Sequence, residues 1–225
     1  MYISAPSYVI PGTYLENVRF ISGIREIENV ELFFFVFDAE TENLLLKEID
    51  SILSFNDRFG FTVHLPDIIE SKHEKLIELT RDFTRHYVIH PPAGDIDTFL
   101  FLLDDWISRY GERFLLENLA EREWELLIRK RDRLKLCFDT GHLLLNNGNP
   151  GFFMKRYAGR IEEIHLHGVR DGWDHQSFRW DESWFQELSA SLEGFAGVVN
   201  LEVFRYEQLQ EIIDSLQHNG LIIKY

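Results

Sequence analysis

Cysteine is almost absent from the 225-residue chain, which contains only Cys137. A single cysteine excludes an internal disulfide framework and a cysteine-rich zinc site, and it fits a reducing compartment. Any metal ligands in this protein must therefore be histidines and carboxylates.

Long hydrophobic runs are also missing. The longest apolar stretches, such as ELFFFVF, are too short to cross a bilayer. The first residues, MYISAPSYVIPG, lack the basic start and the following apolar segment of a secretion signal. These absences predict a soluble, cytoplasmic protein with no membrane partner.

The chain has no excess of basic residues. It carries 38 acidic against 23 basic residues, a formal net charge of −15, and this charge repels a polyanion. Nucleic acid is therefore a disfavoured partner, and the charge is most simply understood as a surface adapted for solubility.

What the chain does contain is a regular alternation of strand-like and helix-like segments, with no linker, low-complexity tract or repeat to divide it. We expect one domain over residues 1–225. Helical spacing is found, for example, at 42–55, 68–83, 97–109 and 184–192. Eight strands are predicted, at 8–11, 30–37, 60–65, 87–90, 113–118, 134–139, 161–167 and 198–204.

This alternation predicts an α/β fold in which parallel strands are covered by helices. Eight such units in 225 residues match a single closed (β/α)8 TIM barrel. An open doubly wound sheet is the alternative. It would normally carry a glycine-rich phosphate turn after its first strand, and VIPGTYLEN contains only one glycine.

The active site of a TIM barrel lies at the carboxyl ends of its strands. Six consecutive predicted strands, the third to the eighth, end in a potential metal ligand. Because side chains alternate along a strand, these residues can all point into the barrel while their apolar neighbours face the helices. The residues are His64, His90, Glu117, Asp139 with His142 just beyond it, His165 with His167, and Glu202.

Buried carboxylates that converge on one place repel each other unless cations lie between them, which favours metal ions. A single residue of this kind can also have a purely structural role: a strand-end histidine can be a hydrogen-bonded core residue, and Glu117 or Glu202 can pair with Arg113 or Arg205. The seven residues other than His167 are, taken together, much harder to account for without metal. We expect the remaining candidates, His73, His86 and His218, to be surface residues of helices or turns.

The sharpest local motif is Asp139-Thr-Gly-His142, in which the glycine permits a tight turn. The loop HGVRDGWDHQSFRW then adds Asp171, Asp174 and His175, either as ligands or as a solvated charged loop. Three tryptophans around this loop, Trp173, Trp180 and Trp184, are candidates for a wall that stacks on a flat substrate, although such residues also often serve packing.

This pattern resembles the xylose-isomerase-like TIM barrels of the AP endonuclease family 2 superfamily. These include sugar isomerases, epimerases and endonuclease IV-type abasic-site endonucleases. In the isomerases and epimerases a Glu, an Asp, a His and a Glu hold one metal ion. The matching residues here are Glu117, Asp139, His165 and Glu202.

The endonuclease-type members have further histidines, which match His64, His90 and His142. The resemblance implies one ion on His64, His90 and Glu117, a second on Glu117, Asp139, His165 and Glu202, and a third on His142 with an Asp-x-His pair. This chain departs from the last element, because Asp174 directly precedes His175 and Trp173 stands at the aspartate position. His167 is a possible substitute.

A narrower resemblance rests on SYVIPGTYLENVRF, VELFFFVFD, FTVHLP, DTGHLLL and HLHGVRDGWDHQSF. These segments are similar to the cobamide-remodelling phosphodiesterases, which remove the nucleotide loop of corrinoids. The resemblance implies a metal-dependent phosphodiesterase with a small-molecule corrinoid substrate. It implies two or three divalent ions, with zinc favoured by the histidines and manganese, iron or cobalt as alternatives.

In this hypothesis Glu117, Asp139 and Glu202 are catalytic, and His167, Asp174 and Trp173 bind substrate. The metal ligands are His64, His90, Glu117, Asp139, His142, His165, His175 and Glu202. Three alternatives stay open: a sugar or sugar-phosphate isomerase or epimerase with a single metal, an abasic-site endonuclease, and a barrel that binds corrinoid or sugar without catalysis.

Overall fold

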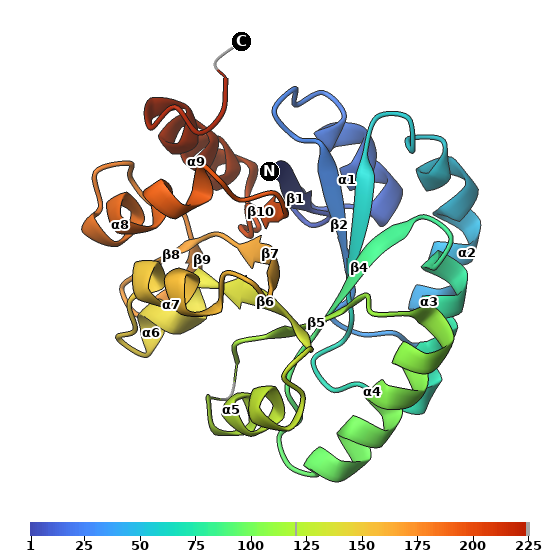
Figure 1. Cartoon of the computed structure of the whole chain (residues 1–225). Coiled ribbons are helices and arrows are strands. Elements are labelled where there is room, and N and C mark those ends of the chain that lie inside the picture. Colours follow the sequence, from blue (N-terminus) through green and yellow to red (C-terminus); the bar gives the residue numbers. More distant parts are fainter. Residues whose placement is uncertain (120, 224–225) are drawn as a thin grey trace.

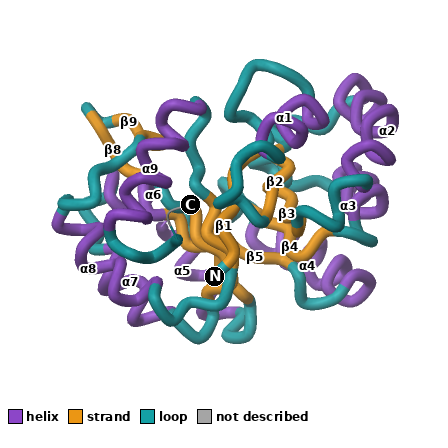
Figure 2. Tube along the Cα trace, turned by 90° about the horizontal axis from the view of Figure 1, so that it is seen from above, coloured by secondary structure: helices purple, strands orange, loops and turns teal. Residues whose placement is uncertain are grey.

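The protein, described here by a computed structural model of residues 1–119 and 121–223, is a closed barrel of eight parallel strands. The strand order around the barrel is β1-β10-β7-β6-β5-β4-β3-β2. Figure 2 shows the strands at the centre and helices around them. The strands are β1 (Tyr2–Pro6), β2 (Asn29–Phe33), β3 (Gly60–His64), β4 (Thr84–Ile89), β5 (Phe114–Glu117), β6 (Lys135–Asp139), β7 (Ile161–His165) and β10 (Val198–Asn200).

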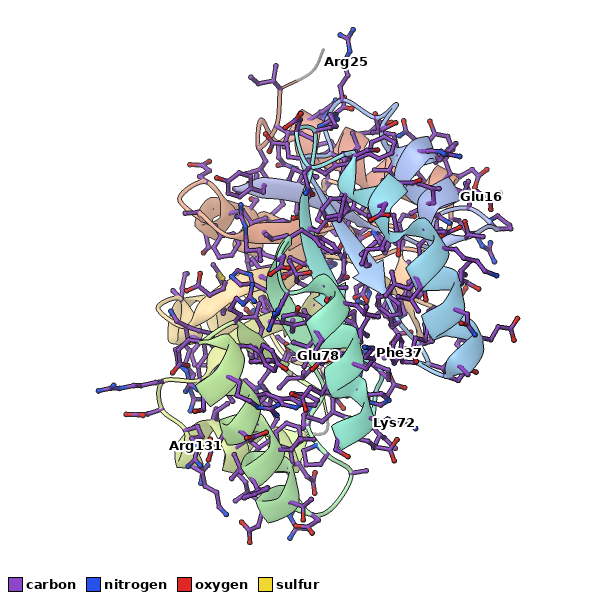
Figure 3. The ribbon with its side chains drawn as sticks, turned by 90° about the vertical axis from the view of Figure 1, so that its right-hand side faces the viewer. Glu16, Arg25, Phe37, Lys72, Glu78 and Arg131 are labelled. Carbon is purple, nitrogen blue, oxygen red and sulfur yellow. The ribbon has the colours of Figure 1, made fainter. Side chains whose placement is uncertain are left out.

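Helices follow the barrel strands and form the outer ring (Figure 1). Charged side chains such as Glu16, Lys72 and Glu78 lie on the outer surface of the molecule (Figure 3). The helices are α1 (Tyr14–Ile21), α2 (Ala39–Leu53), the 3-10 turn η1 (Ser71–His73) continuing into α3 (Glu74–Thr80), α4 (Ile96–Tyr110), α5 (Glu121–Lys130), α6 (Thr140–Leu145), α7 (Pro150–Tyr157), α8 (Ser183–Leu192) and α9 (Tyr206–His218).

Several helices begin at side chains that bind free backbone N–H groups. Thr13 and Glu16 form a reciprocal capping box at the start of α1. Asp38 accepts hydrogen bonds from two N–H groups of α2, and Asp95 does the same for α4. The Asp38 cap explains why α2 begins at Ala39, three residues before the predicted start.

The predicted TIM barrel is confirmed, but the position of its first strand was wrong. The predicted strand at 8–11 lies in a turn, and β1 is formed by Tyr2–Pro6, in which Ile3 and Ala5 are buried. The turn is held by Asn17, whose side chain accepts a hydrogen bond from the Ile10 N–H and donates one to the Ile10 carbonyl. Apolar residues of this turn therefore look strand-like without being paired.

Inside the barrel the side chains form a polar layer with a small apolar patch. Val88, Leu115 and Cys137 form a buried cluster that is separate from the main core between strands and helices. This separation agrees with the predicted alternation of inward and outward residues. The buried polar residues include Ser4, Asn29, Glu31, Thr62, Glu163 and Asn200.

A two-stranded hairpin that was predicted only as a loop follows β7. It consists of β8 (Gly168–Arg170) and β9 (Trp173–Gln176), joined by Asp171 and Gly172, which both have positive φ. An Asp-Gly pair favours this kind of tight hairpin turn, so the sequence did carry a signal for it. Among the described residues, no helix is both long and apolar enough to span a bilayer.

Candidate metal centre

The carboxyl ends of the strands bring together the residues that the sequence singled out. Glu117, Asp139 and His165 are the last residues of β5, β6 and β7, while His90 and Glu202 follow β4 and β10 closely. These five side chains are buried in the mouth of the barrel. The barrel topology therefore brings residues that are far apart in sequence close together in one cluster.

Glu117 lies at the centre of this cluster. Its Oε2 is 3.3 Å from His64 Nε2, 3.4 Å from His90 Nε2 and 3.3 Å from His165 Nδ1. Its Oε1 is 3.0 Å from His142 Nδ1. Both oxygens of one carboxylate are therefore shared among four histidines, an arrangement that suits a bridging ligand.

Glu202 and Asp139 form the next part of the cluster. Glu202 Oε2 is 3.0 Å from His165 Nδ1 and 3.8 Å from His175 Nδ1. Asp139 Oδ2 is 2.8 Å from His167 Nε2, and Asp139 Oδ1 accepts a hydrogen bond from the His142 N–H at the start of α6. Asp139 thus joins the strand end to the helix that carries His142.

The hairpin loop brings Asp174 and His175 to the same mouth. Asp174 Oδ2 is 3.6 Å from His142 Nε2 and 3.9 Å from His175 Nε2. The neighbouring Trp173 is 73% exposed. Of the two adjacent residues, Asp174 is therefore the one that faces the candidate ligands.

His167 has both ring nitrogens engaged. Its Nδ1 accepts a hydrogen bond from the His175 N–H, which leaves Nε2 to donate to Asp139. The side chain is also fully buried. His167 is better placed to orient Asp139 than to bind a substrate.

The donor atoms of the cluster fit divalent metal ions. Metal bonds of about 2.1 Å at angles near 90 to 110° place two donors about 3.0 to 3.4 Å apart, which is the spacing found around Glu117. Buried atoms without a hydrogen-bond partner include Nε2 of His90, Nδ1 of His142 and His165, and Oε2 of Glu202. Such atoms are costly in a protein interior unless a cation binds them.

Three-residue groups of close donors can be identified across the mouth. The buried His and Glu clusters are consistent with divalent metal binding. Within the described residues the groups are His64, Glu117 and His165; Glu117, Asp139 and His142; His142, Asp174 and His175; His167, His175 and Glu202; and Glu31, His165 and Glu202.

The electrostatics of the cluster keep its carboxylates ionised. Burial alone would raise the pKa of Glu117, but the facing histidines, His90 foremost, outweigh burial and hold this pKa well below its usual range. Burial likewise opposes charge on His90 and His142, yet the nearby carboxylates raise the pKa of each to about 10. The protonated histidines thus balance the negative charge of the carboxylates. A metal cation bound between these residues can supply the same positive charge.

Two acidic residues at the site were missed by the sequence analysis. Glu31 on β2 is fully buried, lies with its Oε1 3.2 Å from His165 Nε2, and has a pKa raised to about 7 by burial. Asp67 Oδ1 lies 3.3 Å from His90 Nδ1. Both carboxylates can orient a ligand histidine through its other ring nitrogen. Strand alternation places Glu31 on the inward face with Phe33, and this was the available signal.

Two of the three predicted surface histidines are not surface residues. His73 is buried, because its ring turns inward from η1 and its Nδ1 accepts a hydrogen bond of 3.1 Å from the Glu70 N–H. His86 belongs to β4, and its side chain is only 17% exposed. His218 is exposed as predicted.

Of the three tryptophans considered for a stacking wall, two serve packing, the other role that the sequence left open. Trp180 stacks on His218 at a centroid distance of 3.9 Å, and Trp184 packs against Phe178 at 4.9 Å. Both contacts are local packing around α8 and α9. Only Trp173 stays beside the mouth.

The arginine partners considered for the two glutamates do not pair with them. Arg113 donates to the carbonyls of Arg81 and Thr84. Arg205 forms no ion pair with the described residues; it lines a pocket of about 480 Å³ with Arg170, Trp173, Asp174, His175 and Phe204. The pocket adjoins the candidate ligands Asp174 and His175.

Comparison with known proteins agrees with this fold. The chain is 28% identical over 114 residues to an inosose dehydratase of Lacticaseibacillus casei, a match that covers 48% of this chain and 35% of the relative. The chain thus spans about a third of the length of that curated relative.

Solved structures match over almost the whole chain. A 3-keto-D-glucoside 4-epimerase from E. coli has a TM-score of 0.65 at 17% identity and covers 99% of this chain and 100% of its own. An AP endonuclease of family 2 from Brucella melitensis has a TM-score of 0.62 at 15% identity, covering 97% and 98%. The family model described as "Xylose isomerase-like TIM barrel" matches residues 74–219, more than half of the chain. The chain belongs to the xylose isomerase-like TIM-barrel family.

Proposed function

We propose that this protein is a metal-dependent phosphodiesterase with at least two divalent ions, and that its substrate is a cobamide whose nucleotide loop it removes. The observation that carries the proposal is the position of Glu117, whose two oxygens lie 3.0 to 3.4 Å from four histidines. A single ion bound by Glu117, Asp139 and Glu202 needs fewer histidine ligands than the four that surround Glu117.

The ligands divide into three groups in this proposal. His64, His90 and Glu117 would hold one ion, and Glu117, Asp139, His165 and Glu202 would hold a second. A third group consists of His142, His175 and Asp174. The distances of 3.6 and 3.9 Å from Asp174 to these two histidines support Asp174 as the carboxylate of this group, in place of the residue at position 173.

Divalent ions at this site would supply Lewis acidity and a water of lowered pKa. The residues of the chain then have three tasks. Glu117, Asp139 and Glu202 set the spacing of the ligand groups; Glu31 and Asp67 fix the ring orientation of His165 and His90; and the buried mouth limits the access of bulk water. The high share of histidine among the ligands favours zinc, while manganese, iron and cobalt are compatible with the same donors.

An anionic substrate is supported by the pocket beside Asp174 and His175. Arg170 and Arg205 line this pocket, and neither forms an ion pair with a described residue. Asp171 and Asp174 line the same pocket, and in a chain of net charge −15 the two arginines are the groups of its lining that suit a phosphate.

A second candidate function is a sugar isomerase or epimerase with one metal ion. The named relatives, an inosose dehydratase and a 3-keto-D-glucoside 4-epimerase, support this candidate more directly than they support the phosphodiesterase. Glu117 and Glu202 would then move a proton next to a substrate carbonyl. This candidate gives no role to His64 and His90.

The two functions are separated by their products. The zinc-loaded protein is incubated with adenosylcobalamin, with a panel of keto sugars and sugar phosphates, and with an abasic DNA duplex, and products are identified by mass spectrometry. We expect cobamide cleaved at the phosphodiester and unchanged sugars, and we expect no cleavage by Asp139→Ala. An altered sugar with intact cobamide would establish the second candidate instead, and a nicked duplex would identify an abasic-site endonuclease.

A further inference from the structure

Four aromatic rings meet at one side of the barrel mouth. Tyr8 follows β1, Phe33 and Phe35 lie at and beyond the end of β2, and Phe204 follows β10. These three strands are neighbours in the barrel, so their carboxyl ends share one part of the rim. We call Tyr8, Phe33, Phe35 and Phe204 the aromatic face.

The rings of the aromatic face contact one another. Centroid distances are 5.2 Å for Tyr8 and Phe35, 5.9 Å for Tyr8 and Phe204, and 5.9 Å for Phe35 and Phe204. Phe33 is buried and contacts two of these rings, at 4.5 Å from Phe35 and 5.7 Å from Phe204. Their interplanar angles of 75°, 85° and 65° place the three outer rings edge-to-face, so together they form an apolar cluster of several rings.

The aromatic face is continuous with the candidate metal centre. Phe33 stacks on His64 at 4.2 Å with an interplanar angle of 22°, and Phe204 packs against His175 at 4.7 Å. These histidines belong to two different ligand groups. A substrate bound over the ligands would therefore extend directly onto the rings.

The outer rings are only partly covered by other residues of the chain. Tyr8 is 48% exposed and Phe35 is 46% exposed, and the neighbouring Val36 is also exposed. Apolar side chains that gather at the rim of a polar site are typical of ligand pockets, where they give contact area while polar groups give orientation.

We propose that the aromatic face binds a large, flat ring system of the substrate, while the phosphodiester lies over the ligand cluster. The inference rests on the proposed phosphodiesterase function. It adds the position at which the larger part of the substrate binds. Offset and edge-to-face contacts with several rings favour a broad conjugated ring over a small ligand.

The test uses cobinamide, a corrin ring without the nucleotide loop, whose binding to the metal-loaded protein is measured by equilibrium dialysis. We expect the double variant Tyr8→Ser/Phe35→Ser to bind cobinamide about tenfold more weakly than the wild type, and Tyr8→Phe to bind it as the wild type does. The control is Phe101→Ala, which removes a 78% exposed ring from α4; it should leave binding unchanged. Metal content and melting temperature verify that each variant is folded and loaded.

Equal binding by the double variant and the wild type would overturn the inference, and so would an absence of cobinamide binding to the wild type. Hydrolysis of bis(p-nitrophenyl) phosphate by the wild type is measured in parallel, because this small diester tests the proposed function without the aromatic face. Hydrolysis without cobinamide binding rejects the inference alone. Cobinamide binding that depends on Tyr8 and Phe35, without hydrolysis of any diester, rejects the phosphodiesterase and keeps the ring-binding face.

Discussion

Glu117 connects more ligand groups than any other side chain of the mouth that the structure describes, since its oxygens face His64, His90, His142 and His165. Glu117→Gln keeps the shape of the side chain and removes its charge. We expect the variant to lose at least one metal ion per chain and at least about 100-fold in hydrolysis, because a bridging ligand is replaced by a weaker neutral one.

Metal content measured by inductively coupled plasma mass spectrometry, together with the rate of cobamide cleavage, tests this prediction. Glu112→Gln is the matched control, since Glu112 is exposed just before β5. Full metal content and activity in Glu117→Gln would remove Glu117 from the site.

Another single residue, His73, lies outside the candidate metal centre and makes the stability of the fold depend on pH. Burial foremost, together with Lys72, lowers the pKa of His73 below the ordinary 6.5, and its Nδ1 must be unprotonated to accept from the Glu70 N–H. The neutral ring therefore stabilises the folded state above pH 6.5. This contribution is lost as the pH falls from 6.5 towards the folded pKa, because the unfolded chain binds the proton more readily.

The free energy of unfolding of wild type and His73→Gln, measured by urea denaturation between pH 8 and pH 5, tests this sign. We expect the advantage of the wild type, about 1 kcal/mol at pH 8, to shrink below pH 6.5. An advantage that stays constant or grows as the pH falls would contradict the account.

At the scale of elements, α6 must lie close against the end of β7. Gly141 in α6 faces the ring of His167, and a Cβ at position 141 would overlap that ring. His167 in turn holds Asp139 through a hydrogen bond of 2.8 Å. A side chain at position 141 would therefore disturb a candidate ligand indirectly.

We expect Gly141→Ala to lower the melting temperature by several degrees, as an overpacked site costs about 1 to 3 kcal/mol, and to weaken zinc retention. Gly159→Ala is the control, since a Cβ there would meet no atom within 4 Å. Melting curves and zinc competition with a chelator give both readouts. If the two alanine variants behave alike, the close approach of α6 to His167 has no energetic consequence.

The elements also show which parts of the fold could be predicted. Strands such as β3 and β6 are apolar runs closed by polar residues, so their bounds and their ligand residues were found from the pattern. The first strand was misplaced because Val9 and Ile10 are apolar but are held in a turn by Asn17, a tertiary contact that no local pattern reveals. The helix expected at 68–83 is shorter, because the chain first passes through the 3-10 turn η1.

Within the candidate site, the sequence did not show which residues contact one another. Strand-end position revealed Glu117 or Asp139 without any knowledge of contacts. Glu31 lies on the inner face of β2, one strand before the first predicted ligand in the chain, and only the closed barrel brings it to His165. Asp67 was missed for the same reason, since it lies in a loop whose path the sequence does not show.

For the whole molecule, the cluster of ionisable groups makes stability depend on metal. Buried histidines and carboxylates with unpartnered atoms are compensated when a cation binds to the folded state alone. We expect removal of metal by a chelator to lower the melting temperature, with a stabilisation of about 4 kcal/mol at a metal concentration 1,000 times the Kd. Scanning calorimetry of metal-free and zinc-loaded protein measures the difference, and identical melting curves would contradict metal binding at this site.

The central claim is that the mouth of the barrel holds more than one metal ion, and the most direct measurement is the number of ions per chain by native mass spectrometry. We predict two or three ions in the wild type and at least one fewer in His64→Ala, because His64 Nε2 lies 3.3 Å from Glu117 Oε2 and belongs to the first ligand group. A single ion in the wild type, unchanged in His64→Ala, would contradict the phosphodiesterase proposal and establish the one-metal site expected of a sugar isomerase or epimerase.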